Sequence, residues 1–254
     1  METLIRDLKL GVKLLWKDRG FAATALLTLA VCIGANTAIF TIVNSVLLRP
    51  LPVPEANNIL LMSNQYPNAG SPDSANSGVP DYYDRLKAVT AFEEQAMFNF
   101  TGGGTIEIND TPERIVGMAA TPSLFRLLRV APEHGRSFLD SEGEIGDQQR
   151  VILSYGLWQE LYGGDREALG RELRMNGRPY TIVGVMPRHF AFADSEHDVR
   201  LWTPLVFTAE QKSDSARHNN SWFNIGRLKP GATIKQAQAQ VNALNSANLE
   251  RFPK

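Results

Sequence analysis

The hydrophobic pattern begins with one long apolar run near the N-terminus. No charged residue occurs from Phe21 to Leu48. At about 1.5 Å of rise per residue, a helix of this run exceeds the roughly 30 Å of a bilayer's hydrocarbon core. A buried core helix would be shorter and would show a polar face. A cleaved signal peptide would have a shorter apolar core and a small-residue cleavage site. The pattern therefore predicts a transmembrane helix at 21–48.

A second helical pattern precedes this anchor. Between Leu4 and Trp16, apolar side chains share one helical face and lysines share another. Two interpretations fit these residues. In the first, residues 1–20 form an amphipathic helix on the cytoplasmic membrane surface. In the second, they continue the anchor helix into the cytoplasm.

Beyond the anchor, short β-like and helical patterns mix without a repeat, which predicts an α+β domain. A hairpin is expected at 171–186, where two β-rich runs flank Asn176-Gly177. A capping box predicts a helix at 233–249. The other expected strands lie at 58–63, 92–101, 105–109, 113–120, 150–153 and 222–228, the other helices at 80–89, 121–128 and 154–162, and a loop at 67–80.

Charge is distributed unevenly along the chain. Residues 1–20 carry five basic and three acidic side chains, the anchor carries none, and residues 49–254 carry 21 basic and 24 acidic ones. Because basic residues flank membrane spans mainly on the cytoplasmic side, we expect the N-terminus in the cytoplasm and the bulk of the chain in the periplasm. The net formal charge of −1 argues against a nucleic-acid partner.

No motif for catalysis or cofactor binding stands out. The sequence has no G-x-x-x-x-G-K-[ST] motif for phosphate binding. The four histidines lack metal-ligand spacing, and the single cysteine, Cys32, excludes an intramolecular disulfide. An acidic cluster at 140–147 is expected to be a solvated loop. We therefore expect no enzyme activity, no catalytic or metal-binding residue and no cofactor.

The anchor carries features that a simple tether does not need. Small residues recur every four positions, which lets two helix backbones approach closely. Polar side chains in lipid are costly unless they meet a partner. We therefore expect this helix to pack against other membrane helices. The residues expected at that contact are Ala30, Gly34, Asn36, Ala38, Thr41 and Asn44.

An ordered set of segments across about residues 3–245 resembles one family. The segments include IGANTAIF at 33–40, NSVLLRPLP at 44–52, LSYGLW at 153–158, LRMNG at 173–177, YTIVGVMP at 180–187, LWTPL at 201–205 and RLKPG at 227–231. Together they resemble the MacB/FtsX-like ABC-transporter permeases, most closely the large permeases described from acidobacteria.

The resemblance implies a first span, a periplasmic core domain, three further spans and a cytoplasmic ABC ATPase subunit. It implies the bacterial inner membrane as the location, and other permease helices or a second permease copy as partners. The chain stops at Lys254, so the C-terminal transmembrane region is expected to be absent.

Three functions follow from these observations. The first is a permease subunit, or a truncated or split N-terminal piece of one, in a MacB-type export or mechanotransmission system. The alternative is a stand-alone membrane-anchored periplasmic interaction module without transport activity. An anchored hydrolase is the third, and the lack of a catalytic motif disfavours it.

The resemblance also implies a two-lobed core domain at 49–254. A membrane-proximal lobe would combine 55–120 with 219–254 in a split β-α-β arrangement, with both helices on one face of the sheet. The inserted lobe would comprise 121–218. Because the chain stops before the strand expected after the last helix, we expect an unpaired, marginally stable sheet edge at 222–228.

Overall fold

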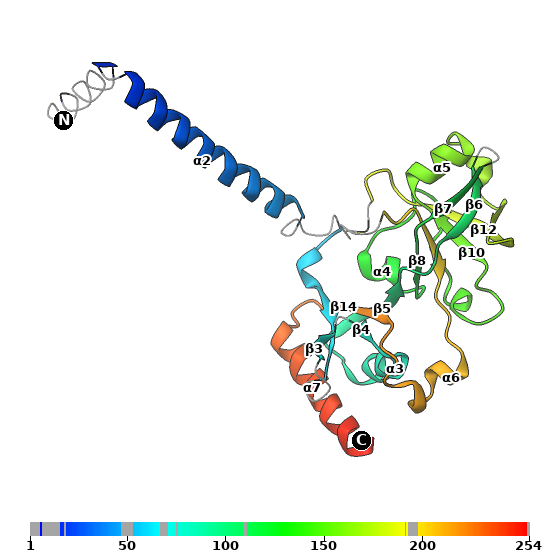
Figure 1. Ribbon diagram of the computed structural model, residues 1–254. Helices are drawn as coiled ribbons and strands as arrows, with labels where there is room; N and C mark the ends of the chain where they lie inside the picture. The colour runs from blue at the N-terminus through cyan, green and yellow to red at the C-terminus, as the bar shows by residue number, and fades with distance from the viewer. Residues whose placement is uncertain are drawn as a thin grey trace. The chain divides into compact units, whose positions relative to one another are not determined.

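The computed structural model (Figure 1) describes most of the 254-residue chain. The described residues are 6, 16–17, 19–46, 53–66, 71–74, 76–108, 111–190, 192 and 198–252, without the side chains at 38–46, 65–66 and 71–74. The chain forms two compact units, Met1–Pro50 and Leu51–Lys254. The predicted amphipathic helix at 1–20 lies almost entirely outside the described residues and stays a prediction.

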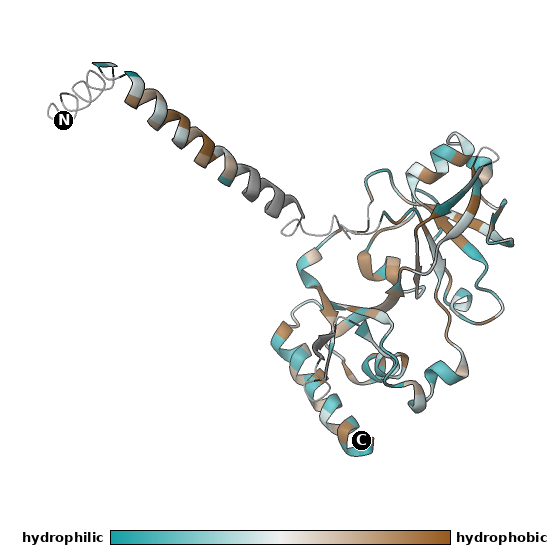
Figure 2. Ribbon diagram, viewed as in Figure 1, coloured by the Kyte–Doolittle hydropathy of each residue, from teal (hydrophilic) through white to brown (hydrophobic). Residues whose placement is uncertain are grey.

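The first unit contains one long helix, α2 (Arg19–Val46), whose ends both lie two residues before the predicted ones. Its segment Arg19–Thr37 is long and apolar enough to cross a membrane, with a mean hydropathy of 1.6 and no part buried inside the structure. Apolar residues predominate along it, as the colouring of Figure 2 shows. The Thr24 and Thr28 hydroxyls donate to main-chain carbonyls four residues earlier, so the helix itself satisfies these polar groups in lipid.

The second unit is built around one mixed sheet, which confirms the predicted α+β class. Two short strands join it beside its main path, and two further strand pairs form separate two-stranded sheets. Along that path, the order is β1 (Ile59–Met62), β14 (Trp222–Leu228), β5 (Phe92–Asn99), β8 (Gly117–Ala120), β13 (Leu201–Pro204), β10 (Arg150–Leu153), β12 (Arg178–Val185) and β11 (Glu172–Met175). The supplementary pairs are β4 (Asn76–Ser77) with β14 and β9 (His134–Gly135) with β12 in the same sheet, β2 (Asn64–Tyr66) with β3 (Ser71–Ser74), and β6 (Gly104–Ile108) with β7 (Thr111–Ile115).

Helices cover both faces of this sheet. The α-helices of the unit are α3 (Val79–Ala88), α4 (Leu124–Leu128), α5 (Tyr155–Tyr162), α6 (Ala209–Lys212) and α7 (Ile234–Arg251). The 3-10 helices are η1 (Ala56–Asn58), η3 (Asp140–Gly143), η4 (Arg166–Ala168) and η5 (Asp214–Ala216).

The first half of the sheet is a split β-α-β unit. Strand β14 lies between β1 and β5 and is antiparallel to both, and α3 connects the β1 side to β5. The faces follow the period-2 alternation of β5: Met97 packs with α3, whereas Ala96 and Phe98 join a core cluster beneath α4. Helix α7 covers the same face as α3, packing Ala237 against Met62 and Leu228.

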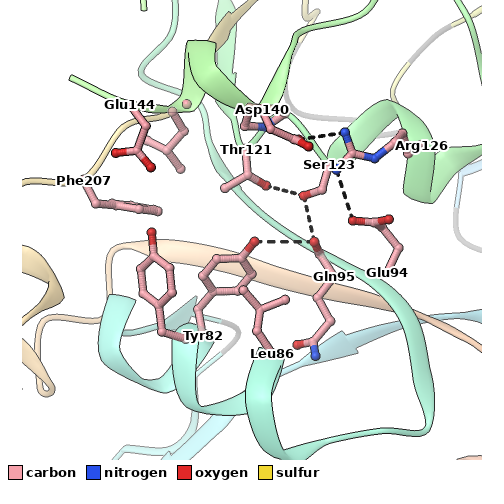
Figure 3. A pocket seen from close by; sticks show the side chains of 14 residues that line it. Tyr82, Leu86, Glu94, Gln95, Thr121, Ser123, Arg126, Asp140, Glu144 and Phe207 are labelled. Carbon is pink, nitrogen blue, oxygen red and sulfur yellow. Dashed lines mark hydrogen bonds and ion pairs between the residues drawn. The ribbon is translucent and has the colours of Figure 1, made fainter. Parts of the chain in front are cut away.

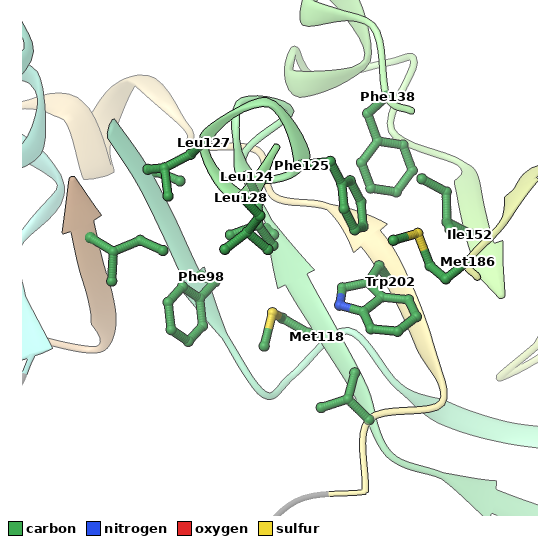
Figure 4. Packing of buried hydrophobic residues seen from close by; sticks show 14 residues of the cluster. Phe98, Met118, Leu124, Phe125, Leu127, Leu128, Phe138, Ile152, Met186 and Trp202 are labelled. Atoms are coloured by element: carbon green, nitrogen blue, oxygen red, sulfur yellow. The ribbon is translucent and has the colours of Figure 1, made fainter. Parts of the chain in front are cut away.

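That core cluster continues into the second half of the sheet. Figure 4 shows Phe125 of α4 and Trp202 of β13 packed against each other, with Met118 of β8 beside them. The ring centroids of Phe125 and Trp202 lie 6.0 Å apart in an edge-on arrangement. On the opposite face, α5 packs Leu157 and Trp158 against a second cluster. One continuous sheet therefore contributes strands to both core clusters.

Several predicted elements are confirmed. Strands β10 and β14 have the predicted bounds. Ser154 caps α5 by accepting a hydrogen bond from the Leu157 N–H, and Thr233 caps α7 in the predicted capping box. The hairpin turns at Asn176 and Gly177, both with positive φ, as a type I′ turn requires.

Other expectations are wrong. The expected strand at 113–120 is two strands, β7 and β8, in different sheets, and the expected loop at 67–80 contains β3, β4 and the start of α3. The segment 222–228 is not a sheet edge, because β14 has β1 and β5 as neighbours. The division into lobes at 55–120 plus 219–254 and at 121–218 stays a prediction.

Candidate functional site

The chain enters the second unit through a short segment that the domain holds tightly. Val53 is the first described residue after the anchor, and it packs half-buried against the core cluster beneath α4. Glu55 follows with a left-handed backbone, φ 50°, and its carbonyl accepts from the Asn58 N–H at 2.9 Å. This turn directs the chain into β1. We call residues 53–55 the entrance segment.

Arg227 of β14 holds the entrance segment. Its side chain is fully buried. Its Nη2 donates to the Pro54 carbonyl at 2.9 Å and its Nη1 to the Glu55 carbonyl at 3.3 Å. Its Nε donates to the Leu127 carbonyl at the end of α4. One side chain therefore joins the entrance segment, α4 and β14 through main-chain acceptors.

A second arginine completes this junction. Arg129, just after α4, pairs with Glu55 at 2.9 Å and with Glu93 of β5 at 2.8 Å. Arg227 lies 3.9 Å from each of the same carboxylates. Glu55, Glu93, Arg129 and Arg227 thus form a charge-balanced group, which we call the entrance cluster.

The electrostatics of the two arginines differ. Burial, together with the nearby Arg129 charge, lowers the pKa of Arg227. A guanidinium nevertheless stays charged at neutral pH because its ordinary pKa exceeds about 12. The hydrogen bond to Glu93 raises the pKa of Arg129. Both cations therefore persist, and charge-assisted hydrogen bonds of this kind are stronger than neutral ones.

The entrance cluster joins four parts of the domain. Its two carboxylates both lie beside arginines, and its members come from the entrance segment, β5, β14 and the residue just after α4. The sequence predicted no functional-site residue within 49–254, so the entrance cluster was not predicted. A signal was present, because Arg227 continues the Phe223 and Ile225 series that faces the apolar core.

The predicted anchor contact residues lie on α2. Ala30, Gly34 and Asn36 are exposed there, and a Cβ built on Gly34 would meet no atom within 4 Å. The Asn36 Nδ2 donates to the Cys32 carbonyl at 3.0 Å, so part of its polarity is satisfied within the helix. Ala38, Thr41 and Asn44 belong to α2, and their side chains lie outside the described part of the chain. The predicted helix contact stays a prediction.

A hollow of about 350 Å³ opens between α3 and the segment around η3. Figure 3 shows hydroxyl groups of Tyr82, Thr121 and Ser123 gathered at its base. Ser123 donates to the Gln95 carbonyl at 2.7 Å, and burial raises the pKa of Tyr82. These hydroxyl groups lie beside a main-chain carbonyl, and the residues lining the hollow include no histidine that could act as their base. The arrangement is therefore typical of a structural hydrogen-bond network.

The acidic cluster at 140–147 is exposed at Asp140, Glu144 and Asp147, as expected of a solvated loop, but not at Glu142. The Glu142 side chain is 1% exposed and pairs with Arg136 at 2.7 Å and Arg150 at 3.2 Å. Burial opposes its ionisation, but these arginines and the Leu139 N–H outweigh burial and lower the pKa of Glu142. Within the described ranges, no group of three or more His, Cys, Asp or Glu side chains is placed to hold a metal ion.

An apolar helix long enough to cross a membrane precedes an α+β sheet domain, and comparisons with known proteins identify the family of this chain. The model of the MacB-like periplasmic core domain matches residues 22–244. A search of curated proteins found no match. The chain belongs to the family of MacB-like periplasmic core domains.

Solved structures share this fold. A domain of a putative permease from Porphyromonas gingivalis has a TM-score of 0.59 at 16% identity, covering 79% of this chain and 86% of that one. The periplasmic region of MacB from Actinobacillus actinomycetemcomitans has 0.54 at 13%, covering 75% and 84%. The extracellular domain of the noncanonic ABC-type transporter YknZ from Gram-positive bacteria has 0.52 at 15%, covering 75% and 92%.

These findings give the chain a permease-associated role. The family is one of ABC-transporter permeases, and the fold is that of their periplasmic or extracellular domains. The helix α2 supplies a candidate membrane anchor for this domain.

Proposed function

We propose that this chain serves in a MacB-type permease as an anchored subunit whose periplasmic domain follows the cycle of a cytoplasmic ABC ATPase. The N-terminus lies in the cytoplasm and residues 49–254 lie in the periplasm of a bacterial inner-membrane protein. The family match supports the permease role. The entrance cluster supports the coupling role.

The observation that carries the coupling role is the fixation of the entrance segment by Arg227. A flexible start of the domain would leave the first described residues after the anchor free to move independently of the sheet. Here the Pro54 and Glu55 carbonyls are both hydrogen-bonded by one buried guanidinium. Because packed interiors deform little, displacement of this segment is passed to β14 and to α4 rather than absorbed locally.

The first experiment asks whether an ATPase binds. The full chain, purified from its native membrane in mild detergent, is expected to co-purify with an ATP-binding subunit. A topology reporter supplies the second arm: alkaline phosphatase fused after residue 60 should be active. An inactive phosphatase fusion together with an active cytoplasmic reporter at the same place would reverse the proposed topology.

The second experiment asks whether the entrance segment responds to ATP. In the complex, ATP is expected to change amide exchange at 53–59. Arg129→Gln should diminish that response, because it removes the ion pair that ties Glu55 of the entrance segment to Glu93 of β5 through Arg129. It should not prevent assembly, because the Arg129 side chain is 35% exposed and the Arg227 hydrogen bonds still hold the domain together. Arg174→Gln, an exposed arginine of β11, is the control.

The alternative function is a stand-alone anchored interaction module without transport activity. It predicts co-purification with an envelope component and without an ATP-binding subunit. That outcome, or an ATP response that is equal in the Arg129→Gln and parent complexes, would contradict the proposed coupling.

A further inference from the structure

The hollow between α3 and the segment around η3 has two ends of different chemistry. At one end, Arg126 pairs with Asp140 at 2.8 Å and with Glu94 at 3.5 Å. Glu144 and Phe207 lie at the other end (Figure 3). The volume of about 350 Å³ falls within the roughly 300–1,000 Å³ that is usual for small-molecule sites. The hollow is therefore large enough for a small organic ligand.

Aromatic and apolar side chains form much of its wall. Tyr82, Tyr83 and Phe207 line the hollow together with Leu86, which is 43% exposed. The Tyr83 ring meets the Phe207 ring edge to face, with centroids 6.3 Å apart. Removing exposed apolar surface of this kind from water stabilises a bound molecule. The wall therefore favours a ligand with an apolar or aromatic body.

The chain places one of its own ammonium groups against two lining residues. Lys212, the last residue of α6, has its Nζ 5.4 Å from the centre of the Tyr83 ring and 3.7 Å from the Glu144 carboxylate. Aromatic faces and carboxylates both attract an ammonium ion. The position of Lys212 thus shows which kind of group the combination of Tyr83 and Glu144 accepts.

This lysine is held loosely enough to be exchanged. Its 3.7 Å separation from Glu144 is longer than a hydrogen bond, and the two side chains are 34% and 71% exposed. Exposed ion pairs of this kind contribute little to stability. The Arg126 guanidinium at the other end, in contrast, donates to Asp140 at 2.8 Å. Lys212 is therefore the cation that a ligand can displace.

The charge balance also favours a cationic ligand. Three carboxylates line the hollow, and two cations, Arg126 and Lys212, lie in it or against it, which leaves a net formal charge of −1. When the Lys212 ammonium moves out to solvent, the Glu144 carboxylate is left without this cation. A positively charged group restores the balance.

We propose that this hollow binds a small amphiphilic amine, a molecule with one ammonium group and an apolar or aromatic body. The ligand ammonium takes the place of the Lys212 ammonium between Tyr83 and Glu144, and its body covers Leu86. The site rests on the residues of the hollow and not on the proposed coupling to an ATPase. Its failure and the failure of the proposed function are therefore separate results.

The test measures binding of phenethylammonium to the full chain in mild detergent by ligand-observed NMR, with empty micelles subtracted. Its neutral isostere, 2-phenylethanol, is the control probe. Phenethylammonium is expected to bind saturably at about millimolar concentration, and 2-phenylethanol about fivefold more weakly because it lacks the charge. Equal affinities of the two probes would overturn ammonium recognition, and lack of saturable phenethylammonium binding would overturn the site.

Two substitutions with opposite expected effects locate the ammonium. Lys212→Met removes the competing cation and should tighten phenethylammonium binding about fivefold, whereas Glu144→Gln removes the carboxylate and should weaken it about fivefold. Lys235→Met and Glu167→Gln, at exposed positions outside the hollow, are the matched controls. Equal affinities of Lys212→Met and Lys235→Met would contradict the displacement of Lys212. Equal affinities of Glu144→Gln and Glu167→Gln would contradict the place assigned to the ammonium.

Discussion

Arg227 occupies a strand position whose neighbours on the same face are apolar. Burying an arginine is costly unless its hydrogen bonds are satisfied. The Pro54, Glu55 and Leu127 carbonyls and the nearby carboxylates of the entrance cluster supply that satisfaction. The inward position of Arg227 on its strand was predictable from alternation, but the groups that it binds were not. These groups lie about 100 and 170 residues away along the chain, and alternation within a strand carries no information on contacts between residues so far apart in sequence.

Replacing Arg227 tests this residue directly. Arg227→Met keeps much of the side-chain length and removes the three hydrogen bonds that Arg227 donates, so the main-chain carbonyls it binds lose their buried partner. We expect a loss of about 2–4 kcal/mol in the free energy of unfolding, measured by urea titration in detergent. Arg174→Met, on an exposed strand position, should change stability by no more than about 0.5 kcal/mol. Equal effects of the two substitutions would contradict the role assigned to Arg227.

Glu142 predicts a pH dependence. Its folded-state pKa lies below the usual value of 4.5, so folding favours the ionised carboxylate. The resulting stability is fully present above about pH 4.5 and is lost as pH falls through the folded-state pKa. Glu142→Gln should therefore be less stable than the parent at pH 7, and the difference should shrink below pH 4.5. Glu144→Gln, whose carboxylate is 71% exposed, is the control. A Glu142→Gln deficit independent of pH would sink this explanation.

At the scale of elements, local chemistry predicted those parts whose ends are marked by specific residues. Ser154 and Thr233 accept main-chain hydrogen bonds at the helix starts, and Asn176-Gly177 supplies the positive φ values of a tight turn. Each of these signals acts over three or four residues, so one sequence is enough to find it.

Elements defined by distant contacts were not predicted. Strand β13 is four residues long and buried throughout between β8 and β10, so it shows no alternation. The expected strand at 113–120 breaks at Val116 because its two halves pair in different sheets. A Cβ on Gly117 would lie 2.6 Å from the Gly103 nitrogen. The break therefore occurs where Gly103 and Gly117 approach closely, and the hydrophobic pattern of the sequence does not show that approach.

The corrected place of β14 gives a prediction for amide exchange. A strand hydrogen-bonded on both sides opens only when a larger part of the sheet opens. We therefore expect amides at 222–228 to exchange at least as slowly as those of the hairpin at 171–186, as measured by hydrogen exchange with mass spectrometry. Faster exchange at 222–228 would restore the sheet-edge hypothesis and contradict the pairing of β14 with β1.

At the scale of the whole molecule, hydropathy and ordered motifs predicted an anchored α+β domain of a permease family, because both signals extend over most of the chain. They did not predict the entrance cluster. For the helix contact of the anchor, the sequence predicts the residues but the structure shows no partner, because Gly34 faces open space in a single copy of the helix. This contact therefore has to be tested on the membrane-inserted protein rather than on the periplasmic domain.

Gly34→Leu is expected to weaken assembly and leave insertion unchanged. Leucine suits lipid, so carbonate extraction should recover equal amounts of variant and parent from membranes. A bulky side chain at Gly34 prevents close approach of a second backbone, and we expect about a fivefold loss, near 1 kcal/mol, in recovery of partner membrane subunits in mild detergent. Ala35→Leu adds similar bulk about 100° around the helix from Gly34, at an exposed residue outside the predicted contact, and is the matched control. If Gly34→Leu and Ala35→Leu assemble alike, the small residues of α2 do not form a helix contact.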